Sequence, residues 1–310
     1  MAILIALVPA LTWGLMATIT TKLGGTAGQQ TLGTSLGALV LGLGVYVLYV
    51  VPQGVTIPAS VWLTGLLSGM CWSLGNTGQY LAYKDLGVSV GLPLSTAGQI
   101  VANAVMAAVV LGGWTTAKMW GFGTLAILII VFGATQISGR SRTGASAITP
   151  SKMRHGLIVL AWSTLGFMLY FVFPNLMAKL GIVSASFHAA DHGLTYMTAV
   201  ILPQAIGQLI GALVLIIAVF HEKQLILEKH SFTNILTGLA WAVGNLCMLI
   251  SAGNPQVGQT VATTLSQMCV IVGTFCGIFL LHERKTPKQM RHIAVGTLLM
   301  ALGGMIIANL

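Results

Sequence analysis

The chain has 310 residues, of which 56% are hydrophobic and 6% are charged, and its formal net charge is +9. Soluble domains carry roughly 25% charged residues, so this composition excludes an ordinary water-soluble protein. The positive charge does not indicate a nucleic-acid partner, because the cations lie in short segments between long apolar runs. In such segments, basic residues orient a membrane protein.

Apolar runs of about 20 residues recur along the chain, and this is the length that a helix needs to cross a lipid bilayer. The first run follows Met1 without the basic leader of a signal peptide, so we expect it to be a helix of the mature fold. The sequence predicts an all-α membrane protein of ten transmembrane helices. We expect these helices at residues 2–21, 31–51, 60–82, 90–112, 119–138, 155–173, 194–220, 232–251, 257–281 and 290–309.

The basic residues are distributed unevenly between the loops. Odd-numbered loops contain twelve Lys and Arg residues and even-numbered loops contain two, Lys118 and Lys179. Because basic residues favour the cytoplasmic side, the count predicts a multi-pass protein of the cell membrane with odd loops inside and both termini outside. The four cysteines lie within predicted spans, with no CxxC pair and no His at ligand spacing, so we expect no metal site and no cofactor.

Two parts of the chain carry matching patterns. Trp72, Gly75 and Asn76 recur as Trp241, Gly244 and Asn245, and in both halves a lone Gln follows on the next apolar segment, at Gln99 and Gln267. The pattern Q-x-x-G-x-x-x-G-A-L-V begins at Gln30 and again at Gln204, and Trp13 in the first span matches Trp162 in the sixth.

These matches predict that helices one to five correspond in order to helices six to ten. Because each copy has an odd number of spans, the second copy starts from the opposite face, which gives two inverted five-helix repeats. We assign the first repeat to residues 1–138, a basic linker to residues 139–154 and the second repeat to residues 155–310. Inverted repeats of this kind are typical of carriers that work by alternating access.

The candidate substrate site consists of uncharged amides and indoles that recur in the two halves. An amide within a span is costly unless it faces a protein interior or a wet cavity. Amides and indole N–H groups suit a ligand rich in hydroxyls, although the amides could equally bond neighbouring helices and the indoles could anchor the membrane interface. The candidates are Trp72, Asn76, Gln99, Trp241, Asn245, Gln267, Gln30, Gln204, Trp13 and Trp162.

Glycines four residues apart follow Gln30 and Gln204. Gly33 with Gly37, and Gly207 with Gly211, are small-xxx-small pairs. Such pairs let two helix backbones approach closely in lipid, and a smooth helix face also allows one bundle to rock against another.

The coupling ion is harder to predict. None of the five carboxylates falls in the middle of a predicted span, whereas a proton relay usually has one there. His188, Asp191 and His192 would share a face if this segment were helical, and they would then form a titratable cluster. The alternative is that the segment is a solvated loop.

The chain resembles the glucose/ribose porter family of the drug/metabolite transporter superfamily, the sugar uptake proteins of Gram-positive bacteria. The resemblance is carried by the two Trp segments, the stretch Pro93 to Gln99, the Leu265-Ser266-Gln267 triplet and the Gly277 to Leu281 segment. It implies uptake of a monosaccharide across the plasma membrane, with protons as the coupling partner. Members usually have Gly-Glu-Trp where this chain has Gly112-Gly113-Trp114, so any coupling role of that carboxylate is absent here.

Three functions remain to be separated. We expect a secondary carrier for glucose or ribose, with membrane lipid and a small sugar as its partners and no nucleic acid, and the oligomeric state is open. An exporter of drugs or metabolites on the same fold is the alternative, but the embedded carboxylate that would favour cationic drugs is missing. An enzyme is not expected, because no nucleophile and base pair or metal cluster is recognisable.

Overall fold

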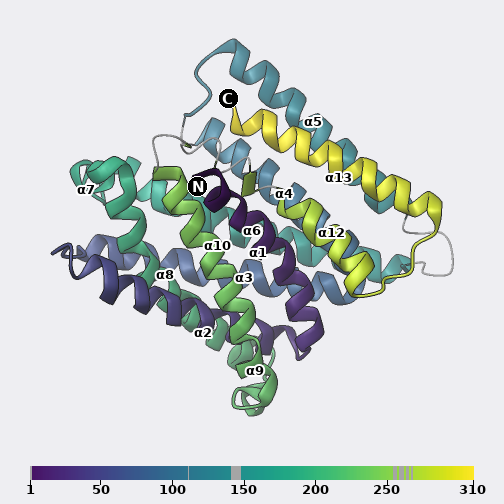
Figure 1. The fold of residues 1–310 in the computed structure, drawn as a ribbon, viewed down its shortest axis with the longest axis horizontal. Coiled ribbons are helices and arrows are strands. Elements are labelled where there is room, and N and C mark those ends of the chain that lie inside the picture. Colours follow the sequence, from purple (N-terminus) through teal and green to yellow (C-terminus); the bar gives the residue numbers. More distant parts are fainter. Residues whose placement is uncertain are drawn as a thin grey trace.

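The structure is a computed structural model that describes residues 2–110, 112–140, 148–253, 257, 262, 265–266 and 268–310. In this part of the chain, all regular secondary structure is helical. Figure 1 shows the helices packed at varied angles around a crowded centre, with the N-terminus near the middle of the view.

Long helices make up most of the fold. They are α1 (Ala2–Leu23), α2 (Ala27–Val45), α3 (Ala59–Leu86), α4 (Val88–Val109), α5 (Ala117–Arg140), α6 (Pro150–Lys179), α8 (Leu194–Val214), α10 (Ile235–Gly253), α12 (Cys269–Leu280) and α13 (Pro287–Ala308). The short elements between them are α7 (Ala185–Ala189), η2 (Ala190–Gly193), η4 (Lys223–Leu225) and α9 (Lys229–Thr233). Both α2 and α8 end in a π-helical turn, η1 (Tyr46–Val50) and η3 (Leu215–Val219).

Local sequence explains where several helices begin. Thr26 and Gln29 form a capping box at the start of α2, and Thr286 with Gln289 does the same for α13. Each pair satisfies two backbone N–H groups that the first turn leaves free. Gly87 adopts a φ of 75° between α3 and α4, a conformation that side chains disfavour, so glycine permits the sharp reversal there.

In the part of the chain that the structure describes, seven helical segments are long and apolar enough to cross a membrane: Ile3–Leu23, Ala27–Val50, Val88–Met106, Ala117–Ile137, Pro150–Lys179, Leu194–Val219 and Pro287–Ile307. The other three predicted spans overlap α3, α10 and α12, which are not among these seven. α12 has only 12 residues, and α3 is interrupted by Ser, Thr, Asn and Gln side chains. The chain is therefore an all-helical, multi-pass membrane protein.

Both predicted boundaries of α6 differ from the structure. α6 begins at Pro150, within the predicted linker, because Thr149 caps it and proline suits the first helical turn. The same helix continues through Pro174 to Lys179, where the sequence predicts the start of a long loop. Residues 141–147 of the predicted linker lie outside the described residues.

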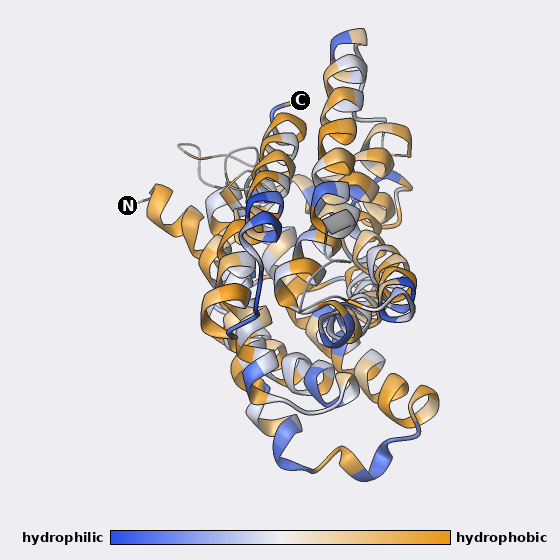
Figure 2. Cartoon of the chain, turned by 90° about the vertical axis from the view of Figure 1, so that its right-hand side faces the viewer, coloured by the Kyte–Doolittle hydropathy of each residue, from blue (hydrophilic) through white to orange (hydrophobic). Residues whose placement is uncertain are grey.

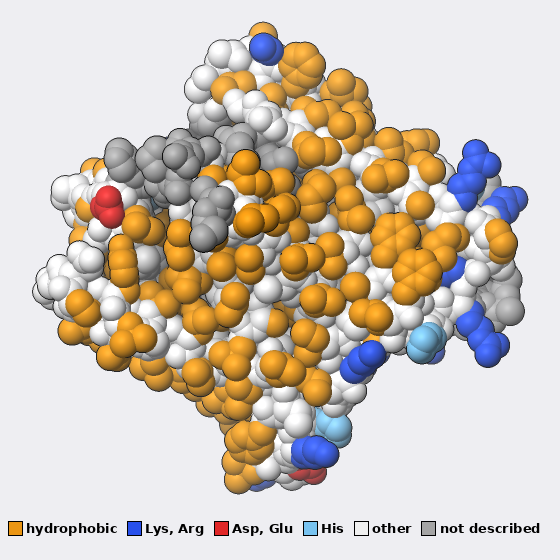
Figure 3. Space-filling view, viewed as in Figure 1, with side chains coloured by type: hydrophobic (Ala, Val, Ile, Leu, Met, Phe, Trp, Pro, Cys, Tyr) orange, Lys and Arg blue, Asp and Glu red, His pale blue; other side chains and the backbone are white. Residues whose placement is uncertain are grey.

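The outer surface is apolar. Figure 2 shows hydrophobic colouring along the helices, with the strongly hydrophilic segments at helix ends and connections. In Figure 3 hydrophobic side chains cover most of the visible face, and Lys and Arg side chains gather at its right and lower edges. Such a surface suits contact with lipid, with the charges at the membrane boundary.

The helices pack into two groups that each combine distant parts of the sequence. α1 and α2 pack on α10, and we call these three helices the α2 group. α6 and α8 pack on α3, and these three form the α8 group. Beside them, α4 packs against α6 and α12, and α5 lies along α13, as Figure 1 shows at its upper right.

Glycines bring helix backbones into direct contact within each group. A Cβ atom placed on Gly37 of α2 would lie 2.3 Å from the carbonyl oxygen of Ile235 on α10. One placed on Gly207 of α8 would lie 2.2 Å from the carbonyl oxygen of Leu66 on α3. No side chain fits at either crossing, which is the close approach that small-xxx-small pairs predict.

Candidate functional site

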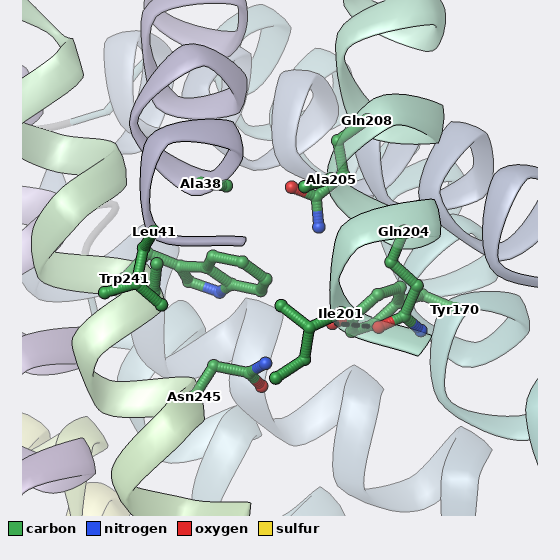
Figure 4. Close-up of a pocket in the computed structure, with 10 residues that line it drawn as sticks. Ala38, Leu41, Tyr170, Ile201, Gln204, Ala205, Gln208, Trp241 and Asn245 are labelled. Atoms are coloured by element: carbon green, nitrogen blue, oxygen red, sulfur yellow. Dashed lines mark hydrogen bonds between the residues drawn. The ribbon is translucent and has the colours of Figure 1, made fainter. Parts of the chain in front are cut away.

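A small internal cavity lies between the α2 group and the α8 group. It is lined by Ala38 and Leu41 of α2, Tyr170 of α6, Ile201, Gln204, Ala205 and Gln208 of α8, and Trp241, Ala242 and Asn245 of α10. Figure 4 shows the amides of Gln204, Gln208 and Asn245 and the indole of Trp241 around this space. Its volume of about 10 Å³ is room for roughly one water molecule.

Aromatic rings form one wall of the cavity. The ring of Trp241 lies 4.8 Å from that of Trp72 and 6.2 Å from that of Tyr170, measured between centroids. Trp72 is buried behind Trp241 and meets Phe167 edge to face at 6.4 Å. The indole N–H of Trp13 donates to the carbonyl oxygen of Trp241 at 3.1 Å, which fixes this part of α10 against α1.

Two of the predicted amides line the cavity. Gln204 is buried, its Nε2 donates to Ser68 Oγ at 3.0 Å, and its Oε1 accepts from the hydroxyl of Tyr170 at 3.5 Å. Asn245 is also buried, and its side chain lines the same space. Both amides therefore lie at the cavity wall.

Two other predicted amides lie outside the cavity wall, Asn76 buried and Gln99 half-buried. Neither amide atom of Asn76 has a hydrogen-bond partner among the described residues. Gln99 donates to Ser95 Oγ at 3.1 Å, and the same oxygen accepts from Gln79 at 2.8 Å. Gln99 thus takes part in a polar contact between α3 and α4.

The remaining candidates lie elsewhere. Gln30 donates to the carbonyl oxygens of Thr20 at 3.1 Å and Gly24 at 3.3 Å, so it binds the end of α1. Trp162 is 58% exposed on the outside of α6. Gln267 lies outside the described residues.

Two lining residues, Gln208 and Tyr170, are absent from the predicted set. Gln208 follows Gln204 by four residues, so the two amides share a helix face, and this spacing is a signal from which it could have been predicted. Tyr170 has no such signal, because the sequence does not separate it from the other aromatic residues of α6.

The contacts of α2 and α8 also correct the register of their shared pattern. Gly37 approaches a residue six positions before Trp241, and Gly207 approaches one six positions before Trp72. A Cβ on Gly69 would lie 2.1 Å from the carbonyl oxygen of Gln204, and one on Gly238 would lie 2.1 Å from that of Thr34. By these contacts Thr34, and not Gln30, takes the position of Gln204, and Ala38 takes that of Gln208.

Among the described residues, no charged side chain lines the cavity. Four of the five carboxylates lie instead in the predicted odd loops or beside them, where each joins a segment before residue 140 to one after residue 150. The pairs are Glu222 with Thr26, Glu228 with Gln29, Asp85 with His155, and Glu283 with Val88 and Ser89.

The neutral lining limits what this site can bind. Burying an unpaired charge is costly, so a cavity without a charged partner favours an uncharged ligand. Amides and a tyrosine hydroxyl can accept and donate several hydrogen bonds, while the faces of aromatic rings contact apolar C–H surfaces. Among the described residues, no group of His, Cys, Asp and Glu side chains could hold a metal ion.

Known proteins give an independent comparison. The sequence profile described as "Sugar transport protein" matches residues 4–310. A putative sugar uptake protein of Lactiplantibacillus plantarum is 36% identical over 308 residues, which cover 99% of each chain. The glucose uptake protein GlcU of Bacillus subtilis is also 36% identical, over 96% of this chain and 95% of the relative.

The fold is similar to a solved one as well. A crystal structure with 14% sequence identity superposes with a TM-score of 0.59, covering 98% of this chain and 95% of its own. At this identity the likeness concerns the fold alone. The match over nearly the whole sequence confirms the resemblance predicted from the two Trp segments, and the chain therefore belongs to the sugar transport protein family.

Proposed function

We propose that this protein takes up a monosaccharide, glucose or ribose, across the plasma membrane as a secondary carrier, with its substrate site at the cavity between the α2 and α8 groups. The observation that carries the proposal is the lining: three amides, a tyrosine hydroxyl and an indole, without a charge. This chemistry fits a neutral polyol. The name of the Bacillus subtilis relative, a glucose uptake protein, supports glucose as the first sugar to test.

The size of the cavity supports alternating access. Ligand pockets usually measure about 300–1,000 Å³, so a space of about 10 Å³ cannot hold a sugar. Since its walls come from both helix groups, the groups must move apart before a sugar can enter. We infer that the structure corresponds to a closed state, and that rocking of the two groups opens the site to one side of the membrane and then to the other.

We further propose that the chain consists of ten spans in two inverted repeats, residues 1–138 and 155–310, joined by the linker 139–154. The support is that helix pairs exchange between the halves: α3 packs on α6 and α8 as α10 packs on α1 and α2. The same exchange relates α4 with α6 to α12 with α1. By the charge count, we assign the odd loops to the cytoplasm.

We propose protons as the coupling ion, following the family resemblance. The cavity has no carboxylate, so coupling requires protonation elsewhere that changes the balance between closed and open states. Protonation of the carboxylates that join the two halves, such as Glu222 and Glu283, changes this balance if their contacts exist in the closed state alone.

The test is uptake of labelled glucose and ribose into proteoliposomes, with and without a pH gradient, beside a cationic dye. We expect sugar uptake that an inward proton gradient accelerates, and no dye transport. Trp241→Ala should abolish uptake, whereas Trp162→Ala is the matched control, since its ring is exposed outside α6. Dye transport without sugar uptake would support an exporter and overturn the proposal.

A further inference from the structure

One polar atom of the cavity wall has no hydrogen-bond partner among the described residues. The amide of Gln204 is bonded at both ends, to Ser68 and to Tyr170. The side chain of Gln208 is 1% exposed, and its Oε1 has no hydrogen-bond partner among the described residues. Buried polar atoms are nearly always bonded, so an unpaired oxygen in a cavity wall indicates a position that can hydrogen-bond a ligand.

The backbone of Gln208 is held firmly. Its carbonyl oxygen accepts from Ser73 Oγ at 2.6 Å and from Ser35 Oγ at 3.2 Å, so α3 and α2 both bind α8 at this residue. A Cβ on Gly69 would lie 2.8 Å from the Gln208 nitrogen, which leaves no room for α8 to shift toward α3. An unpaired amide on a fixed backbone is preorganised for a ligand, since little order is lost on binding.

The corresponding position on α2 lacks an amide. By the glycine contacts, the position of Gln208 on α8 corresponds to Ala38 on α2, and both residues line the cavity. Figure 4 shows Ala38 and Gln208 on helices that face each other. The two corresponding positions therefore differ: α8 presents an amide to the cavity where α2 presents only a methyl group.

We propose that Gln208 is a specificity-determining residue that recognises one hydroxyl of the sugar, whose O–H donates a hydrogen bond to the amide oxygen of Gln208. This assignment rests on the proposed function. A neutral amide can also donate through Nε2, so a pair of neighbouring hydroxyls on the sugar ring satisfies both ends. The ligand class is thus a sugar with an intact vicinal diol, and a sugar that lacks one of these hydroxyls is rejected.

The test uses the full-length protein in proteoliposomes, with Gln208→Met and the matched Gln30→Met. Both substitutions replace a buried amide by an apolar chain of similar length, but Gln30 is bonded to backbone carbonyls away from the cavity. Competition by a series of monodeoxy and monofluoro glucoses is measured against labelled glucose. For the wild type and Gln30→Met, we expect one deoxy position to weaken competition by about tenfold, the usual loss for one hydrogen bond.

In Gln208→Met, glucose should itself bind about tenfold more weakly, and the penalty at that deoxy position should disappear. The fluoro analogue at the same position accepts hydrogen bonds but cannot donate them, so it should behave like the deoxy sugar in the wild type. Thermal unfolding separates recognition from structure: Gln30→Met should lower the midpoint, and Gln208→Met should not.

An unchanged deoxy profile in Gln208→Met overturns the assignment while the sugar-uptake function stands. If that variant does not fold, Gln208→Asn, which withdraws the amide by one methylene, must show the same loss of discrimination. Absence of sugar uptake by the wild type is a different failure: it overturns the proposed function and this assignment together.

Discussion

α2 and α8 carry the same eleven-residue pattern, yet the polar side chains of the two helices have different surroundings. On α2, Gln30 binds the carbonyl oxygens at the end of α1, and Thr34 binds the Gln30 carbonyl and the Tyr80 hydroxyl. On α8, Gln204 and Gln208 lie in the cavity wall. The surroundings of a motif, and not the motif alone, therefore decide whether an amide stabilises the fold or faces a ligand.

Depth in the helix accounts for the difference. Gln30 is the fourth residue of α2, whereas Gln204 is the eleventh of α8. At a rise of about 1.5 Å per residue, these positions lie about 4.5 Å and about 15 Å from the start of their helices. An amide in the first turn meets neighbouring helix ends, whose carbonyls need donors, and an amide at mid-helix meets the interior.

The largest effect should come from the glycines that hold both helices in place. Gly37→Ala and Gly207→Ala each introduce a methyl group about where a backbone carbonyl lies, so we expect each to lower stability by about 3 kcal/mol. Gly44→Ala in α2, where nothing lies within 4 Å of the added atom, is the matched control and should be neutral or slightly stabilising. Thermal unfolding in detergent measures all three, and tolerance of Gly37→Ala alone would break the equivalence of the crossings.

A second comparison replaces the polar residues that occupy corresponding positions. Gln204→Met leaves the hydroxyls of Ser68 and Tyr170 without this partner, and Thr34→Val does the same to Tyr80, so each should cost about 2 kcal/mol. Only Gln204→Met should also raise the KM for sugar, because Thr34 does not line the cavity. Equal KM values for the two variants would show that the cavity wall of α8 plays no special part.

A smaller effect is expected where the end of the α8 region contacts the start of α2. Glu222, just after η3, accepts from Thr26 Oγ1 at 2.7 Å. Glu222→Gln removes the charge from this bond and should lower stability by about 1.5 kcal/mol at neutral pH. Unfolding measured at several pH values provides the check. A loss of the same size in Asp191→Asn, whose side chain is exposed, would contradict the specific role of Glu222.

The smallest effect concerns the serine that reaches from α2 to α8. Ser35 donates to the Gln208 carbonyl at a long 3.2 Å and also to the Thr31 carbonyl, so Ser35→Ala should cost about 0.5 kcal/mol. Ser73→Ala removes a shorter bond of 2.6 Å to the same carbonyl and should cost more. Unfolding midpoints of the two variants give the order, and a reversed order would assign the positioning of Gln208 to α2.

The sequence predicts much of this arrangement. Matched Trp segments indicate a shared centre, and Trp72 and Trp241 do meet there. The register of α2 and α8 could not be predicted, since glycines four residues apart allow two alignments one helical turn apart, and each places a glycine on a glycine. Tyr170 could not be predicted either, because tertiary packing decides which face of α6 points toward α8 and the cavity.

The crossings of α3 with α8 and of α10 with α2 have a consequence for assembly. The third long helix of each half, α3 or α10, packs against helices of the other half. Neither half can therefore bury its own apolar faces alone. A chain divided between α5 and α6 should consequently yield two fragments that each aggregate when produced singly, and that recover transport when produced together in one cell. The two halves are thus interlocked, and the α2 and α8 groups, each of which combines helices from both halves, are the packing units of the fold.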